Sequence, residues 1–381
     1  MGGRTGPVEN VVTLFGDTFK GKRVWLSGVT GFKGTWLAEW LLLLGANVRG
    51  FALAPAITPA IFEQTGLGAR LTWDEADLRD AGAVRRSLLA SEPDFVFHLA
   101  AQPLVRLSYA QPIETYMTNV MGTIHVLEAL RGLERPCAAV LVTTDKCYEN
   151  LEGDHRYVEE DRLGGRDPYS SSKAACEIAI ASWRRSFFEE HAVKIATTRA
   201  GNVIGGGDWA PDRIVPDCVR ALQCTGPVVV RQPASTRPWQ HVLEPLSGYL
   251  WLAAVLARPE LRALAADQIT TAYNFGPDPE GERTVADLVT EVLKTWPGTW
   301  VDESDRRGVH EATRLQLSTA KAKALLGWSP VWTFAEAVRE TMTWYRENHA
   351  TDAPGLAHAV TRRQIEAYSQ RAVALGAPWA T

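Results

Sequence analysis

The sequence predicts an α/β fold: a doubly wound parallel sheet, followed by a smaller lobe of mixed α/β structure in the C-terminal half. Three observations predict it. Short β-rich runs alternate with helical segments through the first half, a glycine-rich turn follows the first run, and loops rich in Pro, Gly, Trp and Arg begin after about residue 200. Alternating strands and helices imply right-handed crossovers and a parallel sheet covered on both faces.

The elements can be placed in chain order. The predicted strands are RVWLSG, NVRGFAL, DFVFHLA, AAVLVTT and VKIATTRA. The predicted helices span residues 33–45, about 112–131 and 169–189, the last beginning after Pro168. Four tryptophans at helical apolar positions are predicted to be core: Trp36, Trp40, Trp251 and Trp344.

We divide the chain on this pattern. The expected parts are an N-terminal extension (1–20), a nucleotide-binding domain (21–200, with a return segment at about 238–275), a substrate lobe (201–237 and 276–350) and a C-terminal tail (351–381). With 381 residues and 46% hydrophobic content, the chain can bury a core large enough for two lobes.

Composition excludes several classes of function. A formal net charge of -4 gives no basic surplus for nucleic acid. The most apolar run, WLAEWLLLLGA, is far shorter than the ~20 residues of a membrane span, so we expect neither a signal peptide nor a membrane helix. The five cysteines form no CxxC pair and the eight histidines no HxxxH or HxH, so we expect no metal, no disulfides and a cytoplasmic location.

The first chemical motif is GVTGFKG, residues 28–34, between the first strand and its helix. Gly28, Gly31 and Gly34 let the backbone turn tightly and approach a pyrophosphate at the helix amino end. Phe32 and Lys33 lie in the same turn. The position predicts a dinucleotide site of the Rossmann type, and a tight turn without a ligand remains the alternative.

The motif leaves NAD and NADP open. GFALAP, at the end of the second strand, carries neither the usual ribose-binding acid nor an arginine, and we favour NAD. Asp77 in DLRD is a candidate to bind the adenine amine, or else an exposed loop carboxylate. Further candidate cofactor contacts, several of them in the strand end HLAAQ, are Leu78, Leu99, Ala100, Ala101, Gln102 and Thr118.

A tyrosine and a lysine begin a later helix. In PYSSSKAACE, Tyr169 and Lys173 fall one turn apart on a single helical face. A lysine ammonium near a phenol lowers a pKa that is otherwise ~10, which makes the tyrosine a usable base near neutral pH.

An acid and an amine end another strand, where open α/β sheets bind ligands. VTTDK places Asp145 and Lys146 directly after Thr144. If the two charges pair, both groups are ionised, which is the reverse of a protonated acid beside a neutral amine. Alternation along the strand would separate them, and desolvation would lower the pKa of Lys146. An ion pair that merely caps the strand is the alternative.

The motifs in this order resemble the extended short-chain dehydrogenases/reductases, in their nucleotide-sugar branch. They are GxxGxxG, HLAAQ, TNVMGT, VTTDK and YSSSK. Longer stretches resemble the members that act on CDP-glucose: GFKGTWL, DKCYEN, RAGNVIGGGDWAPDRIVPD and RPWQHVLEPLSGYLWLA. The resemblance covers roughly residues 20 to 330. It implies NAD-dependent conversion of CDP-glucose to CDP-4-keto-6-deoxyglucose.

The resemblance also implies roles. Thr144, Tyr169 and Lys173 form the hydride-transfer set, with Tyr169 taking the proton of the sugar 4-hydroxyl as hydride leaves C4. The 4-ketone acidifies the C5 hydrogen and makes the 6-hydroxyl a leaving group. Asp145 is the expected acid at O6, and Lys146 is the base at C5 or a cation that steadies the enolate. Hydride then returns to C6.

Substrate contacts follow from the same resemblance. The expected residues are Gln102, Asn119, Asn202, Arg213, Arg237, His241 and Glu311. Arginine forks suit a diphosphate because they donate bidentate, charge-assisted hydrogen bonds, although a surface salt bridge remains the alternative for each. The helices at 112–131 and 169–189 could form the bundle of a homodimer or of a higher homo-oligomer.

Two other functions remain open. A dehydratase or 4-epimerase for a GDP-, dTDP- or UDP-sugar would share the fold, but an epimerase needs no acid at O6, so Asp145 argues against it. A non-catalytic dinucleotide-binding regulator would not need Tyr169 and Lys173 in register. No motif recognises cytidine directly, so the preference for CDP rests on the resemblance.

Overall fold

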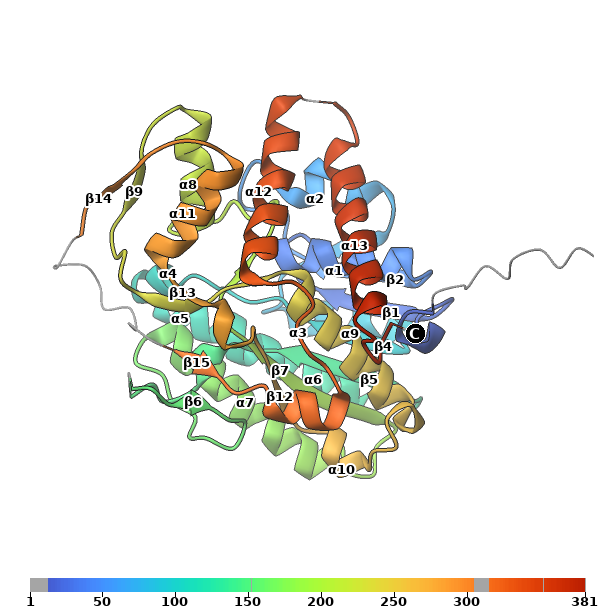
Figure 1. Cartoon of the computed structure of the whole chain (residues 1–381). Helices are drawn as coiled ribbons and strands as arrows, with labels where there is room; N and C mark the ends of the chain where they lie inside the picture. Colours follow the sequence, from blue (N-terminus) through green and yellow to red (C-terminus); the bar gives the residue numbers. More distant parts are fainter. Residues whose placement is uncertain (1–12, 152, 305–314, 352, 381) are drawn as a thin grey trace, which may run out of the picture.

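The central element is a seven-stranded sheet, seen here in a computed structural model that describes residues 13–151, 153–304, 315–351 and 353–380 (Figure 1). Its strands lie in the order β3-β2-β1-β4-β5-β7-β12, and every neighbouring pair is parallel. They are β1 (Arg23–Ser27), β2 (Asn47–Ala52), β3 (Thr72–Glu75), β4 (Phe95–His98), β5 (Cys137–Val142), β7 (Val193–Ala200) and β12 (Ala272–Phe275). The strand order reverses between β1 and β4, which is where such sheets bind ligands. The predicted fold class is confirmed.

Helices cover both faces of this sheet. Strand residues alternate between two core clusters, because successive side chains point to opposite faces. Val24 and Leu26 of β1 pack with α1 (Phe32–Leu43) and α9 (Leu243–Ala257). The opposite cluster joins Trp25 to α3 (Ala81–Ser91), α6 (Gly122–Arg131) and α7 (Pro168–Phe187).

The stretch predicted as one helix over 112–131 is divided. It begins as α5 (Pro112–Tyr116), passes through a π-helical turn at Met117–Met121 and continues as α6. π-helical turns are rare and often occur at functional sites. This one carries Asn119, whose side chain is described below.

The sequence did not predict two strands of the sheet. β3 is the four-residue run TWDE, in which every residue is at least partly exposed, and β12 is the equally short AYNF, which is fully buried. Neither alternates apolar and polar residues, the pattern from which a strand is predicted. β12 lies in the return segment and pairs with β7 at the sheet edge, and α9 from the same segment is buried almost throughout.

The second lobe is built from short pairs of strands and a few helices (Figure 1, upper left). Parallel β9 (Val228–Val230) and β14 (Trp300–Asp302) and antiparallel β10 (Thr236–Pro238) and β13 (Glu282–Thr284) accompany α8 (Ile214–Gln223) and α11 (Val285–Thr295). The smaller pairs are β8 (Val203–Ile204) with β11 (Gln240–His241), and β6 (Arg156–Tyr157) with β15 (Gln316–Leu317). The remaining short α-helices pack on helices of the sheet domain: α2 (Ile61–Gln64), α4 (Val105–Ala110) and α10 (Ala266–Ile269).

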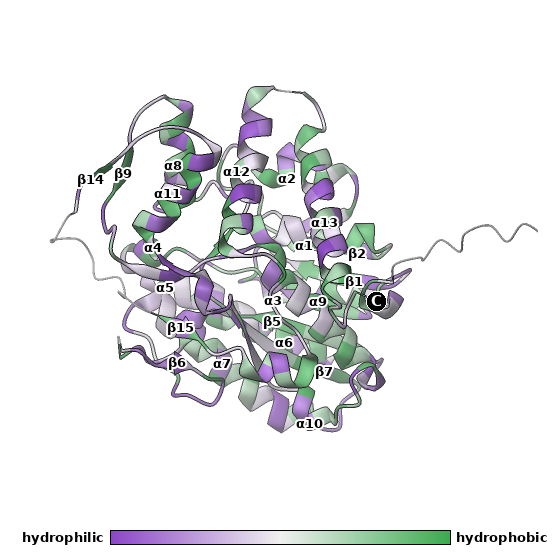
Figure 2. Cartoon of the chain, viewed as in Figure 1, coloured by the Kyte–Doolittle hydropathy of each residue, from purple (hydrophilic) through white to green (hydrophobic). Residues whose placement is uncertain are grey.

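The C-terminal segment, which carried no motif, is part of the folded body. α13 (Leu356–Ala374) packs against α12 (Phe334–Ala350) and α1, and both C-terminal helices carry hydrophilic and hydrophobic turns (Figure 2). The hydroxyl of Tyr368 donates to Glu244 at 2.7 Å, which ties α13 to α9. The four tryptophans predicted as core are buried, with at most 2% of each exposed.

Some broad features of the described residues bear on function. None of their helices combines the length and apolar character that a membrane span requires. Within the same residues, no group of three or more His, Cys, Asp or Glu side chains could hold a metal ion. All five cysteines are free, and four of them are buried.

Candidate active site

A large cavity of about 1470 Å³ lies at the carboxyl ends of β1, β4 and β5 and extends to the second lobe. Its lining includes the turn at 28–34, the strand end at 143–146, and Tyr169 and Lys173 of α7. Pockets for a single small ligand hold about 300–1,000 Å³. This cavity is therefore large enough for a dinucleotide and a second ligand together.

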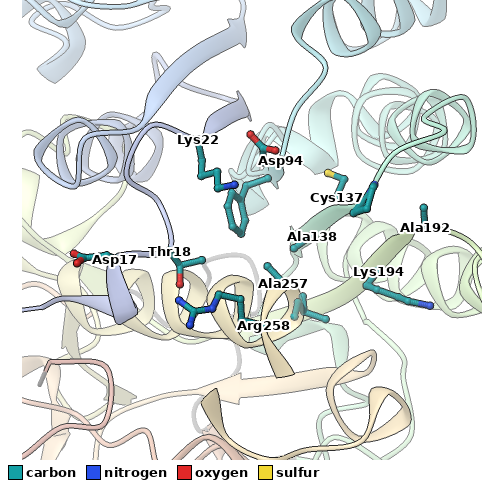
Figure 3. Close-up of a pocket in the computed structure, with 13 residues that line it drawn as sticks. Asp17, Thr18, Lys22, Asp94, Cys137, Ala138, Ala192, Lys194, Ala257 and Arg258 are labelled. Atoms are coloured by element: carbon teal, nitrogen blue, oxygen red, sulfur yellow. The ribbon is translucent and has the colours of Figure 1, made fainter. Parts of the chain in front are cut away.

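A smaller cavity of about 410 Å³ lies at the opposite edge of the sheet, where β4, β5 and β7 begin (Figure 3). Two carboxylates, Asp17 and Asp94, line it. Asp94 is already bound by the Arg135 guanidinium at 2.8 Å and by the Arg23 backbone N–H at 2.8 Å. Burial raises the pKa of the cavity's thiol, Cys137, above the usual range. No activated acid, base or nucleophile emerges from these described residues, so the larger cavity is the candidate site.

The turn at 28–34 needs glycine for steric reasons. Gly28 has φ 77°, a left-handed conformation, and a Cβ there would lie 2.8 Å from the backbone nitrogen of Ala100. A Cβ on Gly34 would lie 2.0 Å from the carbonyl oxygen of Gly28. Gly31 is the N-cap of α1 and makes no side-chain capping bond. The first N–H groups of α1 thus remain available to an anionic ligand.

The chain after β5 turns sharply and buries an acid. Thr144 begins a 3₁₀ turn at Asp145–Cys147, and its hydroxyl donates to Oδ1 of Asp145 at 2.9 Å. Burial raises the pKa of Asp145 and outweighs Lys146, Thr144, Lys33 and Arg237, which all lower it. Oδ2 of Asp145 is buried and has no hydrogen-bond partner among the described residues. The pair therefore does not hold this carboxyl below its usual pKa, and its proton is retained more strongly.

The tyrosine and lysine lie on the first turns of α7, which starts at Pro168 after the N-cap Asp167. Both are buried, and Nζ of Lys173 donates to the carbonyl of Val142 at 3.3 Å. Burial raises the pKa of Tyr169 above its usual range, against a hydrogen bond with Thr144 that lowers it. The net direction is opposite to the expected one, because burial is a larger effect than any nearby cation.

A buried ion pair behind these residues was missed by sequence reasoning. Glu177, the next residue on the Tyr169–Lys173 face, lies 2.9 Å from the guanidinium of Arg199 on β7. It also accepts hydrogen bonds from the hydroxyls of Thr143 and Thr197. Glu177 thus fixes α7 against β5 and β7. The i, i+4 continuation of the face was the signal that could have found it.

Asn119 and Gln102 hold the backbone and do not contact the cavity. The side-chain oxygen of Asn119 accepts from the Gln102 N–H at 2.8 Å, and its nitrogen donates to Ser172 at 2.9 Å. The Gln102 side chain bonds Thr115 at 3.0 Å and the backbone of Leu104. Among the described residues that line the cavity, neither occurs. We expected Asn119 and Gln102 to contact the substrate directly. The structure instead gives both residues a positioning role, because their side-chain polar atoms are already bonded to other protein groups.

His241 is likewise corrected. Its ring is fully buried and packs against Trp36 and Trp332, with ring centroids 5.6 Å and 4.8 Å away. Burial lowers its pKa to about 3, so the ring is neutral. It is absent from the described lining of the cavity, so it is a core residue and not a substrate contact.

The other expected residues are brought together. Those that line the cavity are Phe32, Lys33, Asp77, Leu78, Leu99, Ala100, Ala101, Thr118, Asn202, Arg213 and Arg237. Asp77 forms an ion pair with Arg79 at 2.6 Å. Burial and neighbouring Arg213 lower the pKa of Lys33 to about 8. Glu311 lies outside the described residues.

The cavity also carries arginines that the sequence did not single out. Arg106 of α4 and Arg231, just after β9, both contact Asp212, at 3.1 Å and 3.4 Å. The predicted Arg213 pairs with Asp208 at 2.7 Å. The acidic partners keep these guanidinium groups in place, and their positive charge suits a ligand that carries phosphates.

Comparisons with known proteins find matches over most of the chain. The family model described as GDP-mannose 4,6 dehydratase matches residues 26–341. A CDP-glucose 4,6-dehydratase of Salmonella typhimurium is 44% identical over 86% of this chain and 91% of its own. A dTDP-glucose 4,6-dehydratase of Streptomyces antibioticus is 31% identical, over 85% and 92%. The structure of a double mutant of the dTDP-glucose 4,6-dehydratase from Streptomyces venezuelae, with NAD bound, matches with a TM-score of 0.70, 27% identity, and coverage of 86% and 98%.

Proposed function

Since the chain belongs to the extended short-chain dehydrogenases/reductases of the GDP-mannose 4,6 dehydratase family, we propose that it is an NAD-dependent 4,6-dehydratase of CDP-glucose. The observation that carries the proposal is the composition of one cavity. It joins a glycine turn, the Tyr169–Lys173 pair and a buried carboxyl, Asp145, whose pKa is raised. With a bound dinucleotide, these groups can oxidise C4 of a sugar and eliminate water across C5 and C6.

NAD fits the first part of the cavity. Gly28 and Gly34 leave space that a Cβ would fill, and the amino end of α1 offers N–H groups to a pyrophosphate. Asp77 and the backbone at 99–101 line the same region. NAD bound there would supply the acceptor for the C4 hydride and the source of the hydride that C6 receives. The 27% identical dehydratase solved with NAD supports the choice.

Tyr169 and Thr144 would handle the proton of the 4-hydroxyl. The Tyr169 phenolate accepts this proton as the C4–H bond breaks and becomes the neutral phenol. A hydrogen bond from Thr144, made to Tyr169 in place of Asp145, favours the phenolate because it lowers the pKa of Tyr169. Lys173 is held by Val142 one helical turn away. Glu177 and Asn119 keep α7 in place on either side, so the base is positioned before the substrate binds.

Asp145 would donate the proton for elimination. Once C4 is a ketone, removal of the C5 proton and cleavage of the C6–O bond form a C5–C6 double bond. The 6-hydroxyl leaves as water with the proton from Asp145, whose raised pKa keeps that proton available. Lys146, which also lines the cavity, is proposed as the C5 base or as a cation beside the enolate.

Two observations support CDP as the nucleotide of the substrate: the name of a similar protein and the positive charge of the cavity. The 44% identical protein is a CDP-glucose 4,6-dehydratase, and Arg213 and Arg237 can bind a diphosphate. The test is incubation with CDP-, dTDP-, UDP- and GDP-sugars while the alkaline absorbance of a 4-keto-6-deoxy product is followed. Turnover of CDP-glucose above the others supports the proposal. Turnover of another sugar alone transfers the activity to that nucleotide.

A homodimer is proposed from one apolar face. Ile113, Met117 and Met121 are 73%, 42% and 37% exposed, and Ile178 and Phe187 on the neighbouring α7 are 60% and 43% exposed. Contiguous exposed apolar side chains mark protein interfaces. Sedimentation of Ile113→Glu should give a monomer where the unmodified chain gives a dimer. A cytoplasmic location is proposed from the five free cysteines.

A further inference from the structure

The cavity has an arm in the second lobe that the catalytic residues do not use. It is lined by the middle of β9, the residue that follows β9, and the starts of α8 and α11. These are Val229, Arg231, Asp217 and Val285. Val229 is 41% exposed, although its neighbours in β9 are fully buried. An apolar side chain that faces the cavity in this way can flank a planar ring.

The arginines show in which direction a ligand extends. Arg237 belongs to β10, whose Pro238 lies beside the buried acid: a Cβ on Gly201 would be 2.8 Å from Pro238 and 3.1 Å from Oδ2 of Asp145. Arg213 lines the same cavity as Tyr169. Arg231 contacts acids of the lobe instead: Asp212 at 3.4 Å and Asp217 at 4.0 Å. A nucleotide sugar runs from sugar through diphosphate and ribose to base. With its sugar at Asp145 and its diphosphate at Arg213 and Arg237, its base extends to Arg231.

Arg231 and Asp217 present a donor and an acceptor side by side. Asp217 lies in the first turn of α8, and Arg220 holds its Oδ1 at 2.6 Å. Arg220 also donates to the carbonyl of Trp209 at 3.3 Å. The acceptor is therefore fixed by the protein itself, while Arg231, at 47% exposed, can turn its fork toward a ligand.

This arrangement complements one pyrimidine. Cytosine carries an amino donor at N4 beside the acceptors N3 and O2, and carboxylates accept from N4. Uracil and thymine carry an acceptor, O4, and a donor, N3–H, at the same places. They would set O4 against the Asp217 carboxylate and N3–H against the Arg231 donors, which leaves polar groups unpaired.

We propose that Arg231 and Asp217 select the cytosine base, with Arg231 donating to N3 and O2 and Asp217 accepting from the N4 amino group. The proposal rests on the proposed function in that a nucleotide sugar occupies this cavity. It adds the residues that make CDP-sugars preferred over UDP- and dTDP-sugars.

The test measures binding of CDP, UDP and dTDP by calorimetry to the unmodified chain and to Arg231→Gln. A bidentate contact to a base gives about 5- to 150-fold discrimination, so the substitution should reduce the CDP-to-UDP affinity ratio by about 10-fold or more. Asp217→Asn, whose amide can donate to O4, should raise the affinity for UDP. Thermal melting checks that each variant is folded.

Matched controls separate base selection from general charge. Arg237→Gln should weaken all three nucleotides equally, and Arg106→Gln, which removes the other cation at Asp212, should leave the ratio unchanged. An unmodified chain without a preference for CDP, or an unchanged ratio in folded Arg231→Gln, overturns the inference.

The same experiment distinguishes this inference from the function. If the chain prefers CDP but does not dehydrate CDP-glucose, the proposed reaction fails and the base selection stands. If it dehydrates CDP-glucose and Arg231→Gln keeps the full preference in kcat/KM over UDP-glucose, only the base selection fails.

Discussion

The cavity has two walls that differ in burial. One wall holds the proposed catalytic residues Thr144, Asp145, Tyr169 and Lys173 and is called the catalytic wall. It belongs to the sheet domain, and these residues are at most 8% exposed. The lobe wall is made of Arg213, Arg231, Arg237, Asp212 and Asp217. The Arg213, Arg231 and Asp212 side chains are 37%, 47% and 41% exposed.

The difference separates two tasks. Burial raises the pKa of Asp145, which keeps a proton available for transfer, and the rigid sheet keeps Asp145 and Tyr169 in register. Partly exposed ion pairs on the lobe wall cost little to rearrange and keep their charge for phosphates. The first wall should therefore control kcat, and the second should control KM and the choice of nucleotide.

The largest expected effect comes from the catalytic wall. Tyr169→Phe removes the group that takes the 4-hydroxyl proton, so kcat should fall about 10³-fold. Discontinuous assays of the keto product measure it. Tyr116→Phe is a matched control. The Tyr116 side chain is 39% exposed and its hydroxyl donates to Ser171, so this substitution should leave kcat unchanged. Equal losses in both variants would contradict the role of Tyr169.

The next effect separates oxidation from elimination. Asp145→Asn should leave oxidation at C4 but slow the loss of water about 10²-fold, so that reduced cofactor accumulates and absorbs. In the unmodified chain, water loss should decline as pH rises through the raised pKa of Asp145, because only its protonated form donates. Asp212→Asn on the lobe wall should change KM alone. Undiminished dehydration in Asp145→Asn would remove this residue from the mechanism.

Sequence reasoning recovered the catalytic wall better than the lobe wall, and the reason is physical. Two short motifs contain the residues of the catalytic wall. Thr144 and Asp145 follow the end of β5, and Tyr169 and Lys173 lie at the start of α7, so local spacing alone predicts that each pair lies at the ligand-binding end of the sheet. The contact between Arg106 and Asp212 joins residues 106 positions apart, so no local pattern marks it. His241 was misassigned for the same reason, since Trp36 and Trp332, which bury it, are distant in sequence.

A similar limit applies to the fold. Five strands of the sheet were predicted from apolar runs. TWDE and AYNF were not predicted, because polar residues interrupt each of them and neither contains a continuous apolar run like that of FVFH in β4. The π-helical turn at 117–121 was predicted as ordinary helix. What places Asn119 there is its set of bonds to Gln102 and Ser172, and these form only in the folded chain.

Lys33 tests where the two walls meet. Its pKa is lowered to about 8, and the charges that act on it come from both walls: Arg213, Asp145, Lys173 and Asp208. As pH rises through about 8, Lys33 loses its positive charge and KM for the nucleotide sugar should rise about 5-fold. Lys33→Met should have the high KM at both pH values, so its KM should no longer change. If KM of Lys33→Met still changed fully with pH, the pH dependence would arise from another group.

The smallest effect is that of salt, and it compares the walls without substitution. Charges on the lobe wall are partly exposed, and exposed charges are screened over a Debye length of about 8 Å at physiological ionic strength and about 3 Å at 1 M. Raising the salt should therefore increase KM about 3-fold. Buried Asp145 and Tyr169 are screened far less, so kcat should stay constant. Initial-rate kinetics at several salt concentrations measure both constants. A fall in kcat with constant KM would mean that the exposed charges act on the chemical step, and the division between the walls would have to be given up.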